Sequence, residues 1–183
     1  MAVEIERKFL VVGDEWREHV QRSQRLVQGY LTPGRSPSAA EAMDGRERPL
    51  ADSPGAGCSV RVRTAGESAW LNVKSAVTGI ERREYEYAIP LADAECMLEE
   101  FCAAVIKKIR HYVPCAGVMF EVDEFLGDND GLVVAEIELQ SVGEEFPRPA
   151  WLGREVSDRP RYYNLHLLQH PYSRWNARER AGD

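Results

Sequence analysis

Charged residues recur at every second position in several segments of the chain, and this alternation constrains the fold more than any other feature. In the first segment, Glu4, Glu6 and Lys8 share one phase, and Ile5 and Phe9 share the other. Side chains two positions apart lie on the same face of a β-strand. The same spacing returns in five later pairs: Arg61/Arg63, Glu84/Glu86, Lys108/Arg110, Glu121/Asp123 and Glu136/Glu138. We therefore expect a sheet that has one charged face.

Strand-like runs separated by short turns rich in glycine and aspartate extend through most of the chain. They cover residues 2–12, 26–32, 58–65, 69–76, 80–89, 104–113, 118–126 and 132–140. Eight antiparallel strands of this kind suggest a closed barrel, which has room for packed side chains or one small ligand. The predicted fold class is α+β: an eight-stranded antiparallel closed β-barrel, or tunnel, with flanking helices.

Three segments favour helices, at 14–24, 93–103 and 159–169. In the second of them, Ala94, Met97 and Phe101 lie on one helical face.

Proline and glycine are frequent in residues 33–57, which we interpret as a flexible insertion rather than a lid over a site. The predicted organisation is one domain over residues 1–170, followed by a weakly ordered tail at 171–183. Tyr172 and Trp175 are candidates for anchoring part of that tail.

Composition narrows the function classes. With 183 residues the chain is long enough for a substantial core, and its net charge of −7 argues against general nucleic-acid binding. No apolar run has the length of a membrane span, and the N-terminus has no signal pattern, so a cytoplasmic location is expected. A homodimer is left open. The four cysteines show no metal-ligand spacing, and we expect small, mostly buried thiols.

The charged face has two interpretations. It could face solvent, or it could line the barrel while the apolar face packs against the helices. Enclosed charges lose hydration, so a charged lumen is costly if it serves the fold alone. A polyanion bound to the bases, with divalent cations bound to the carboxylates, would offset that cost.

The charged residue types suit phosphate chemistry. Arginine guanidinium groups match phosphate oxygens in pairs, and lysines act as point charges. Clustered carboxylates suit Mg²⁺ or Mn²⁺. The chain has no GxxxxGK[ST] and no GxGxxG sequence, so a glycine-rich phosphate cradle is not expected. Tyr30 could reach the phosphate end of a lumen or simply pack within its strand.

These motifs together resemble the CYTH, or triphosphate tunnel metalloenzyme, family. Glu4-Ile5-Glu6-Arg7-Lys8 matches its ExExK signature. The resemblance continues in order through nearly the whole chain, at residues 28–31, 59–63, 71–75, 83–86, 108–110, 120–123, 135–138 and 155–164. It implies an eight-stranded tunnel that binds a triphosphate group with a divalent metal, Mg²⁺ or Mn²⁺. The insertion at 33–57 departs from the family pattern and puts substrate size and access in question.

Site residues follow from the resemblance by matching motif. The implied metal ligands are Glu4, Glu6, Glu136 and Glu138. The implied triphosphate-binding residues are Lys8, Arg61, Arg63, Lys74, Lys108 and Arg110. Glu84, Glu86 and Asp123 are the implied supporting acids. The expected catalytic residues are Glu4, Glu6, Lys8, Lys108 and Tyr30.

The expected function is a metal-dependent triphosphatase that hydrolyses tripolyphosphate or a related small-molecule triphosphate. Two alternatives use the same residues. One is a class IV-type adenylyl cyclase that converts ATP to cyclic AMP and pyrophosphate. The other is a binding module for polyphosphate or nucleotides that has no catalytic activity.

Overall fold

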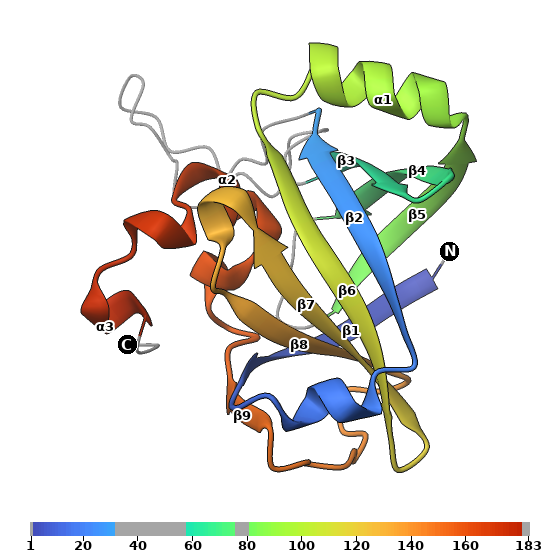
Figure 1. Ribbon diagram of the computed structural model, residues 1–183. Coiled ribbons are helices and arrows are strands. Elements are labelled where there is room, and N and C mark those ends of the chain that lie inside the picture. Colours follow the sequence, from blue (N-terminus) through green and yellow to red (C-terminus); the bar gives the residue numbers. More distant parts are fainter. Residues whose placement is uncertain (1, 32–57, 76–80, 181–183) are drawn as a thin grey trace, which may run out of the picture.

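The computed structural model describes residues 2–31, 58–75 and 81–180, and the predicted insertion at 33–57 falls outside them (Figure 1). The strands are β1 Ala2–Val11, β2 Arg22–Tyr30, β3 Cys58–Ala65, β4 Ser68–Ser75, β5 Glu81–Ile89, β6 Val105–Cys115, β7 Val118–Leu126, β8 Val133–Leu139 and β9 Leu152–Glu155. The α-helices are α1 Leu91–Glu100, α2 Asn164–Gln169 and α3 Ala177–Arg180. The 3-10 helices are η1 Glu15–His19, η3 Gly127–Asn129, η4 Pro160–Tyr162 and η5 Tyr172–Arg174.

Strand pairing forms a ring. The strands are antiparallel neighbours in the order β5-β4-β3-β2-β6-β7-β8-β1, and β1 also pairs with β5. Along β1, residues 2–5 pair with β5, whereas residues 5–10 pair with β8 on the opposite edge. Eight strands therefore close on themselves, which confirms the predicted antiparallel barrel. The ninth strand, β9, was not predicted. It is four residues long and pairs with β1 at Phe9 and Val11.

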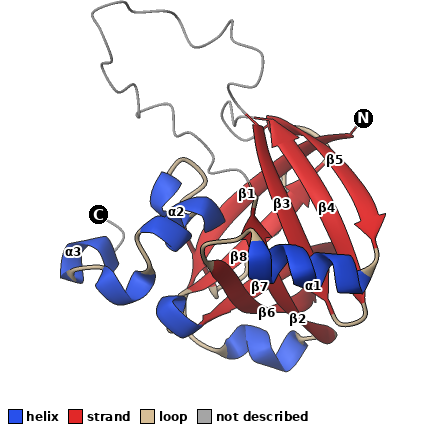
Figure 2. Ribbon diagram, turned by 90° about the horizontal axis from the view of Figure 1, so that it is seen from above, coloured by secondary structure: helices blue, strands red, loops and turns tan. Residues whose placement is uncertain are grey.

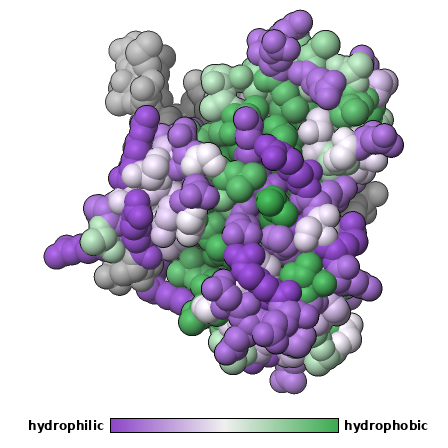
Figure 3. Space-filling model, in the orientation of Figure 1, coloured by the Kyte–Doolittle hydropathy of each residue, from purple (hydrophilic) through white to green (hydrophobic). Residues whose placement is uncertain are grey.

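The outer face of the barrel is largely apolar and is covered on two sides. On one side, Phe9 and Phe120 belong to a buried cluster with Trp16 of η1 and Trp151 of the β8–β9 connection. On the other side, α1 lies across β3 and β4 (Figure 2), and its Ala94 is fully buried. Figure 3 shows apolar side chains beside α1 and along the middle of the same face of the molecule. The apolar face therefore packs outward, which agrees with the second of the two interpretations of the alternation, although part of its cover is a non-helical segment.

Gly29 on β2 is required for this outer packing. A Cβ atom at Gly29 would lie 2.5 Å from Cys102 Sγ and 3.0 Å from Leu98 Cδ2. The absence of a side chain therefore allows α1 and the following connection to lie directly on β2.

One end of the barrel is filled by the C-terminal part of the chain. Ile106 and Phe125 continue the inner faces of β6 and β7 and belong to one buried cluster with Tyr162, Leu167 and Trp175. Trp175 is anchored by a hydrogen bond from its Nε1 to the carbonyl of His170, at 3.0 Å. The interior thus changes from polar to apolar toward this end.

Two predicted helices are corrected by the structure. The helix expected at 14–24 is only η1, because β2 starts at Arg22 and its residues 22–29 form a ladder with β6. The β2–β6 ladder supplies backbone hydrogen bonds to residues 22–24, and the local helical preference of these residues gave no indication of this pairing. The segment 159–169 is divided into η4 and α2 by Tyr163, whose backbone is extended.

The cysteines also differ from expectation. Cys58 and Cys96 are exposed, Cys102 and Cys115 are partly exposed, and all four are free thiols. The expectation of mostly buried thiols is wrong. In residues 2–31, 58–75 and 81–180, no helix has the length and apolar character needed to cross a membrane.

Candidate functional site inside the barrel

The charged face predicted from the sequence lies inside the barrel. Seven charged side chains on six strands are buried to 8 % exposure or less. They are Lys8, Arg61, Lys74, Lys108, Arg110, Asp123 and Glu136. Among the other predicted residues, Glu86 and Glu138 are exposed and Glu4, Glu6 and Arg63 are intermediate. The alternative of a charged face in solvent is therefore wrong for this set.

Six of the interior residues form a paired network on β1, β6, β7 and β8: Lys8, Lys108, Arg110, Glu121, Asp123 and Glu136. Arg110 lies opposite Asp123 in the β6–β7 ladder and donates from Nε to Asp123 Oδ1 at 2.7 Å. Arg110 Nη2 also donates to Asp123 Oδ2 and to Glu136 Oε2, both at 2.6 Å. Lys8 bonds to Glu136, and Lys108 to Asp123. Three cations thus face three carboxylates.

The pKa values of the paired network follow from burial and from these pairs. Burial alone would raise the pKa of Glu136, but Lys8, Lys108 and Arg110 hold it well below its usual value. Burial would likewise lower the pKa of Lys8, and Glu136 and Glu6 raise it instead. The pKa of Lys108 is lowered, by burial and then by Arg110. Burial raises the pKa of Glu121 although Arg110 opposes this. The charged forms of Glu136 and Lys8 are therefore favoured, and Lys108 is the lysine of the network that gives up a proton more easily.

A second group, the acidic cluster, consists of Glu4, Glu6, Glu84 and Glu138 on β1, β5 and β8. Glu6 and Glu138 lie directly opposite each other in the β1–β8 ladder. Lys74 Nζ lies 3.0 Å from Glu4 Oε2 and 2.9 Å from Glu84 Oε2. Although the Glu138 residue as a whole is exposed, partial burial of its carboxylate and then the charges of Glu4, Glu6 and Glu84 raise its pKa. The cluster therefore carries more negative charge than its neighbours neutralise.

Arg61 and Arg63 form a basic wall on β3. The pKa of Arg63 is lowered by burial and then by the positive charge of Arg61, although Glu86 lies 2.9 Å away. Arg61 donates from Nε to Asn72 Oδ1 at 3.4 Å, and its nearest ion-pair contact to Glu84 is 3.7 Å long. The β3 wall is thus suited to an added anion, as the acidic cluster is suited to an added cation.

Two interior residues were not identified from the sequence as site residues. Asn72 is fully buried and donates from Nδ2 to Glu84 Oε1 at 2.7 Å and to Glu86 Oε2 at 2.6 Å. Gln28 is 1 % exposed. Their positions share the strand phase of Lys74 and Tyr30, and this phase could have identified them. Tyr30 itself lies opposite Arg61 in the β2–β3 ladder.

The acidic cluster fits a hard divalent cation. Carboxylate oxygens are the ligands that Mg²⁺ and Mn²⁺ prefer, and a cation would relieve the repulsion that raises the pKa of Glu138. Over residues 2–31, 58–75 and 81–180, no three ligand side chains already converge on one point. Glu136 has one oxygen on Lys8 and the other on Arg110. Glu4 also pairs with Lys74, and Glu6 lies 3.3 Å from Lys8 Nζ. Among the described residues, Glu138 is the member of the predicted metal set that has no ion pair.

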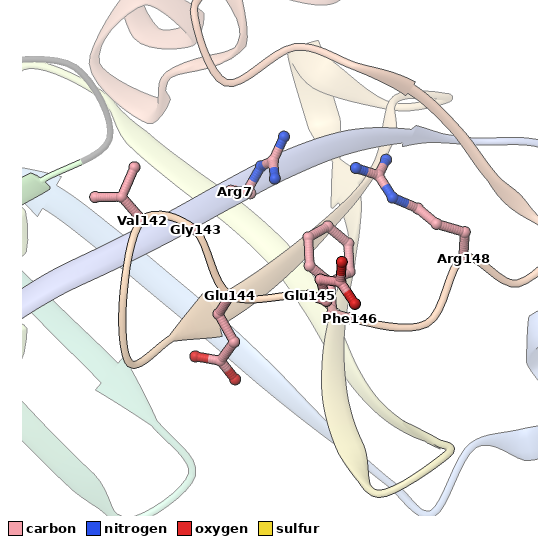
Figure 4. Close-up of a pocket in the computed structure, with 7 residues that line it drawn as sticks. All are labelled: Arg7, Val142, Gly143, Glu144, Glu145, Phe146 and Arg148. Atoms are coloured by element: carbon pink, nitrogen blue, oxygen red, sulfur yellow. The ribbon is translucent and has the colours of Figure 1, made fainter.

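A surface pocket of about 330 Å³ lies on the outer side of β1, away from the charged interior (Figure 4). The guanidinium groups of Arg7 and Arg148 lie 5.3 Å and 4.5 Å from the Phe146 ring centroid. Arg7 is already paired with Glu155, at 2.8 Å from its Nε. The lining also includes Glu144 and Glu145. With paired or opposing charges, this pocket lacks the one-sided charge that the interior walls show.

The sequence profile of the CYTH domain matches residues 2–166. An inorganic triphosphatase of Acetivibrio thermocellus is 40 % identical over 173 residues, which cover 94 % of this chain and 97 % of that protein. An inorganic triphosphatase of Nitrosomonas europaea is 29 % identical, covering 90 % of this chain and 95 % of that one. The crystal structure of the inorganic triphosphatase NE1496 has a TM-score of 0.58 at 28 % identity, covering 92 % of this chain and 95 % of that one.

Proposed function

Because the chain belongs to the CYTH domain family, we propose that it is a metal-dependent triphosphatase, which hydrolyses inorganic tripolyphosphate to pyrophosphate and phosphate. The observation that carries this proposal is that one wall of the barrel has excess negative charge and another wall has excess positive charge. On one wall Glu6 lies opposite Glu138, and burial together with the neighbouring carboxylates raises the pKa of Glu138. On another wall, burial together with the positive charge of Arg61 lowers the pKa of Arg63. A triphosphate with a divalent cation is a ligand that would relieve both.

The basic side chains would bind and orient the substrate. Arg61 and Arg63 offer planar guanidinium groups to the phosphoryl oxygens, and Lys74 adds a point charge from the neighbouring strand. Lys8, Lys108 and Arg110 would share their charges between the substrate and the carboxylates of the paired network. Enclosure in the barrel strengthens these interactions because little water screens them.

The acidic cluster would hold the metal through Glu4, Glu6 and Glu138, with Glu136 joining if it leaves Lys8 or Arg110. A bound Mg²⁺ or Mn²⁺ would neutralise phosphoryl charge and lower the pKa of water. In hydrolysis, water attacks the terminal phosphorus, the bond from that phosphorus to the bridging oxygen breaks, and pyrophosphate leaves with one proton released. Glu84, Glu86 and Asp123 would fix the basic side chains, and Tyr30 would contact the substrate next to Arg61.

The two alternative functions have less support. A cyclase needs a nucleoside pocket in addition to the triphosphate site, and the curated relatives compared above are named as inorganic triphosphatases. A binding module without catalysis would be expected to lose part of the charged set. No carboxylate of the predicted metal set is replaced in this chain, and the ligand chemistry of Glu4, Glu6 and Glu138 suits a divalent cation.

Phosphate release from tripolyphosphate by the purified chain, with Mg²⁺ and separately with Mn²⁺, tests the proposal. Glu4→Gln and Arg61→Ala should each lower kcat/KM by about a hundredfold or more, as loss of one transition-state contact does in enclosed sites. Arg148→Ala, on the outer face of the barrel, is the matched control and should retain activity. Wild-type rates in both site variants would contradict the proposal. Cyclic AMP as the main product from ATP would favour the cyclase, and tight tripolyphosphate binding without turnover would favour the binding module.

A further inference from the structure

Three buried side-chain atoms in the described part of the chain have no hydrogen-bond partner: Gln28 Nε2, Arg63 Nε and Tyr162 Oη. Such atoms are rare in folded proteins, because a buried donor without an acceptor costs stability. Two of the three belong to residues that lie directly opposite each other, Gln28 on β2 and Arg63 on β3. The coincidence of two unmet donors at one position of the ladder indicates a missing acceptor.

Both side chains face the interior of the barrel. Gln28 is two positions from Tyr30, and Arg63 is two positions from the buried Arg61, so each shares the inward phase of its strand. Arg63 is held on both sides: Nη2 donates to Glu86 at 2.9 Å, and the guanidinium carbon lies 5.2 Å from the Trp70 ring centroid. These contacts fix the guanidinium but leave its Nε hydrogen unused.

The chemistry of the missing acceptor follows from its surroundings. Gln28 lies next to the basic wall, where burial and then the positive charges of Arg61 and Arg110 lower the pKa of Arg63. A negative acceptor would therefore be favoured over a neutral one. An amide suits this position because it donates a hydrogen bond without adding a further positive charge beside the arginines.

Tyr162 does not belong to this pair. Tyr162 belongs, together with Ile106 and Trp175, to the apolar cluster at the end of the barrel that the C-terminal part of the chain fills. Burial raises the pKa of Tyr162, although the positive charges of Arg161, Arg154 and Arg159 oppose this. Among the described residues, no second buried donor without a partner belongs to this cluster, so Tyr162 lacks the paired donors seen at Gln28 and Arg63.

We propose that Gln28 is a substrate-binding residue, whose Nε2 donates a hydrogen bond to a phosphoryl oxygen of the group that Arg63 binds. The inference rests on the proposed function, since it takes the triphosphate to occupy the barrel. It adds a neutral donor to a site that the sequence described through charged residues alone. The apo protein keeps this donor unsatisfied, and the substrate supplies its acceptor.

Gln28→Leu tests the inference, because leucine is close in size and has no donor. Tripolyphosphate binding is measured by titration calorimetry without divalent metal, so turnover is not needed, and the Tm of the apo protein is measured in parallel. We expect Kd to rise by about tenfold to a hundredfold, the range for loss of a hydrogen bond to a charged group. The apo Tm should stay unchanged or rise, because a buried unmet donor has been removed. In turnover assays KM should rise more than kcat falls.

Gln24→Leu is the matched control. Gln24 lies on the same face of β2, opposite Arg110, but its Nε2 already donates to the carbonyl of Ala65 at 3.4 Å. Its replacement should leave Kd unchanged and should not raise Tm. Gln28→Glu is a second variant, and it should weaken binding further because the new carboxylate would pair with Arg63 and repel phosphate.

The outcomes separate this inference from the proposed function. Wild-type affinity in Gln28→Leu, or a lowered apo Tm with unchanged Kd, would overturn the inference and would show that the amide serves the fold. Suppose that the wild-type protein binds tripolyphosphate without hydrolysing it, and that Gln28→Leu binds it more weakly. This result would support the inference while the proposed function fails. A wild-type protein that does not bind tripolyphosphate would overturn both.

Discussion

The paired network and the acidic cluster lie inside the same barrel, but they differ in how far their charges are neutralised by neighbouring side chains. In the paired network, Arg110 alone bonds to three carboxylates, and the charges balance. In the acidic cluster, Glu138 faces Glu6 across the ladder and forms no ion pair within the part of the chain that the structure describes. Burial and then repulsion from Glu4, Glu6 and Glu84 raise its pKa. The first region is balanced in the apo protein, whereas the second has an excess of negative charge that the proposed metal would neutralise.

Within this one site, we therefore expect the paired network to stabilise the fold and the acidic cluster to serve the proposed function. Breaking a complete buried network leaves an uncompensated charge, which is strongly destabilising. Removing one member of a group of like charges relieves repulsion and should cost the fold little. The same type of substitution, carboxylate to amide, should therefore have opposite effects on stability in the two regions.

The largest effect is expected from Asp123→Asn. Asp123 is fully buried and accepts hydrogen bonds from both Lys108 and Arg110. Loss of its charge should lower the free energy of unfolding by about 3–5 kcal/mol, the usual cost of removing one partner from a buried pair. Urea denaturation of the apo protein measures this.

An exposed ion pair supplies the control for Asp123→Asn. Arg17 contacts Glu124 at 2.8 Å on the surface, and Arg17→Ala should change the free energy of unfolding by no more than about 1 kcal/mol. If Asp123→Asn proved as mild as Arg17→Ala, the paired network would not be the stabilising half of the comparison.

A smaller effect, on metal binding rather than on folding, is expected from Glu138→Gln. The apo Tm should stay unchanged or rise, because repulsion from Glu4, Glu6 and Glu84 is removed. The increase in Tm on adding Mg²⁺ or Mn²⁺, worth about 2.7 kcal/mol at a hundred times Kd, should be mostly lost. Glu67→Gln, in the exposed turn between β3 and β4, should keep the wild-type metal response. A full metal response in Glu138→Gln would remove this residue from the proposed ligands.

The sequence predicted the barrel well because alternation is a property of each strand. A phase of two places Glu4, Glu6 and Lys8 on one face regardless of their partners, and the recurrence of that phase fixes the inner wall. The sequence did not predict β9 or the start of β2 at Arg22, because both depend on pairing with distant strands. Local helical preference misled the assignment of residues 20–24 for the same reason.

The sequence also did not predict which charged side chains pair with one another. The motif groups Glu136 with Glu4, Glu6 and Glu138 as metal ligands, and nothing in the spacing indicates that Glu136 lies between Lys8 and Arg110. Neutral residues such as Asn72 and Gln28 were missed because an amide among charges carries no signal of its own. Their importance emerges only when each buried hydrogen-bond donor is matched with its acceptor.

The smallest expected effect is a pH dependence that distinguishes the two regions in the absence of metal. The pKa of Glu138 is higher in the folded protein than its ordinary value, so its ionisation destabilises the fold as pH rises through the folded pKa. The extra stability of Glu138→Gln over wild type should therefore be absent at low pH and fully present above that pKa. Glu136 has the opposite sign: its lowered pKa gives stability above the ordinary glutamate value that is lost as pH falls toward the folded pKa. Urea denaturation of wild type and Glu138→Gln across pH measures the loss of stability at high pH and the loss at low pH. A stability difference between the two proteins that did not change with pH would contradict the repulsion in the acidic cluster.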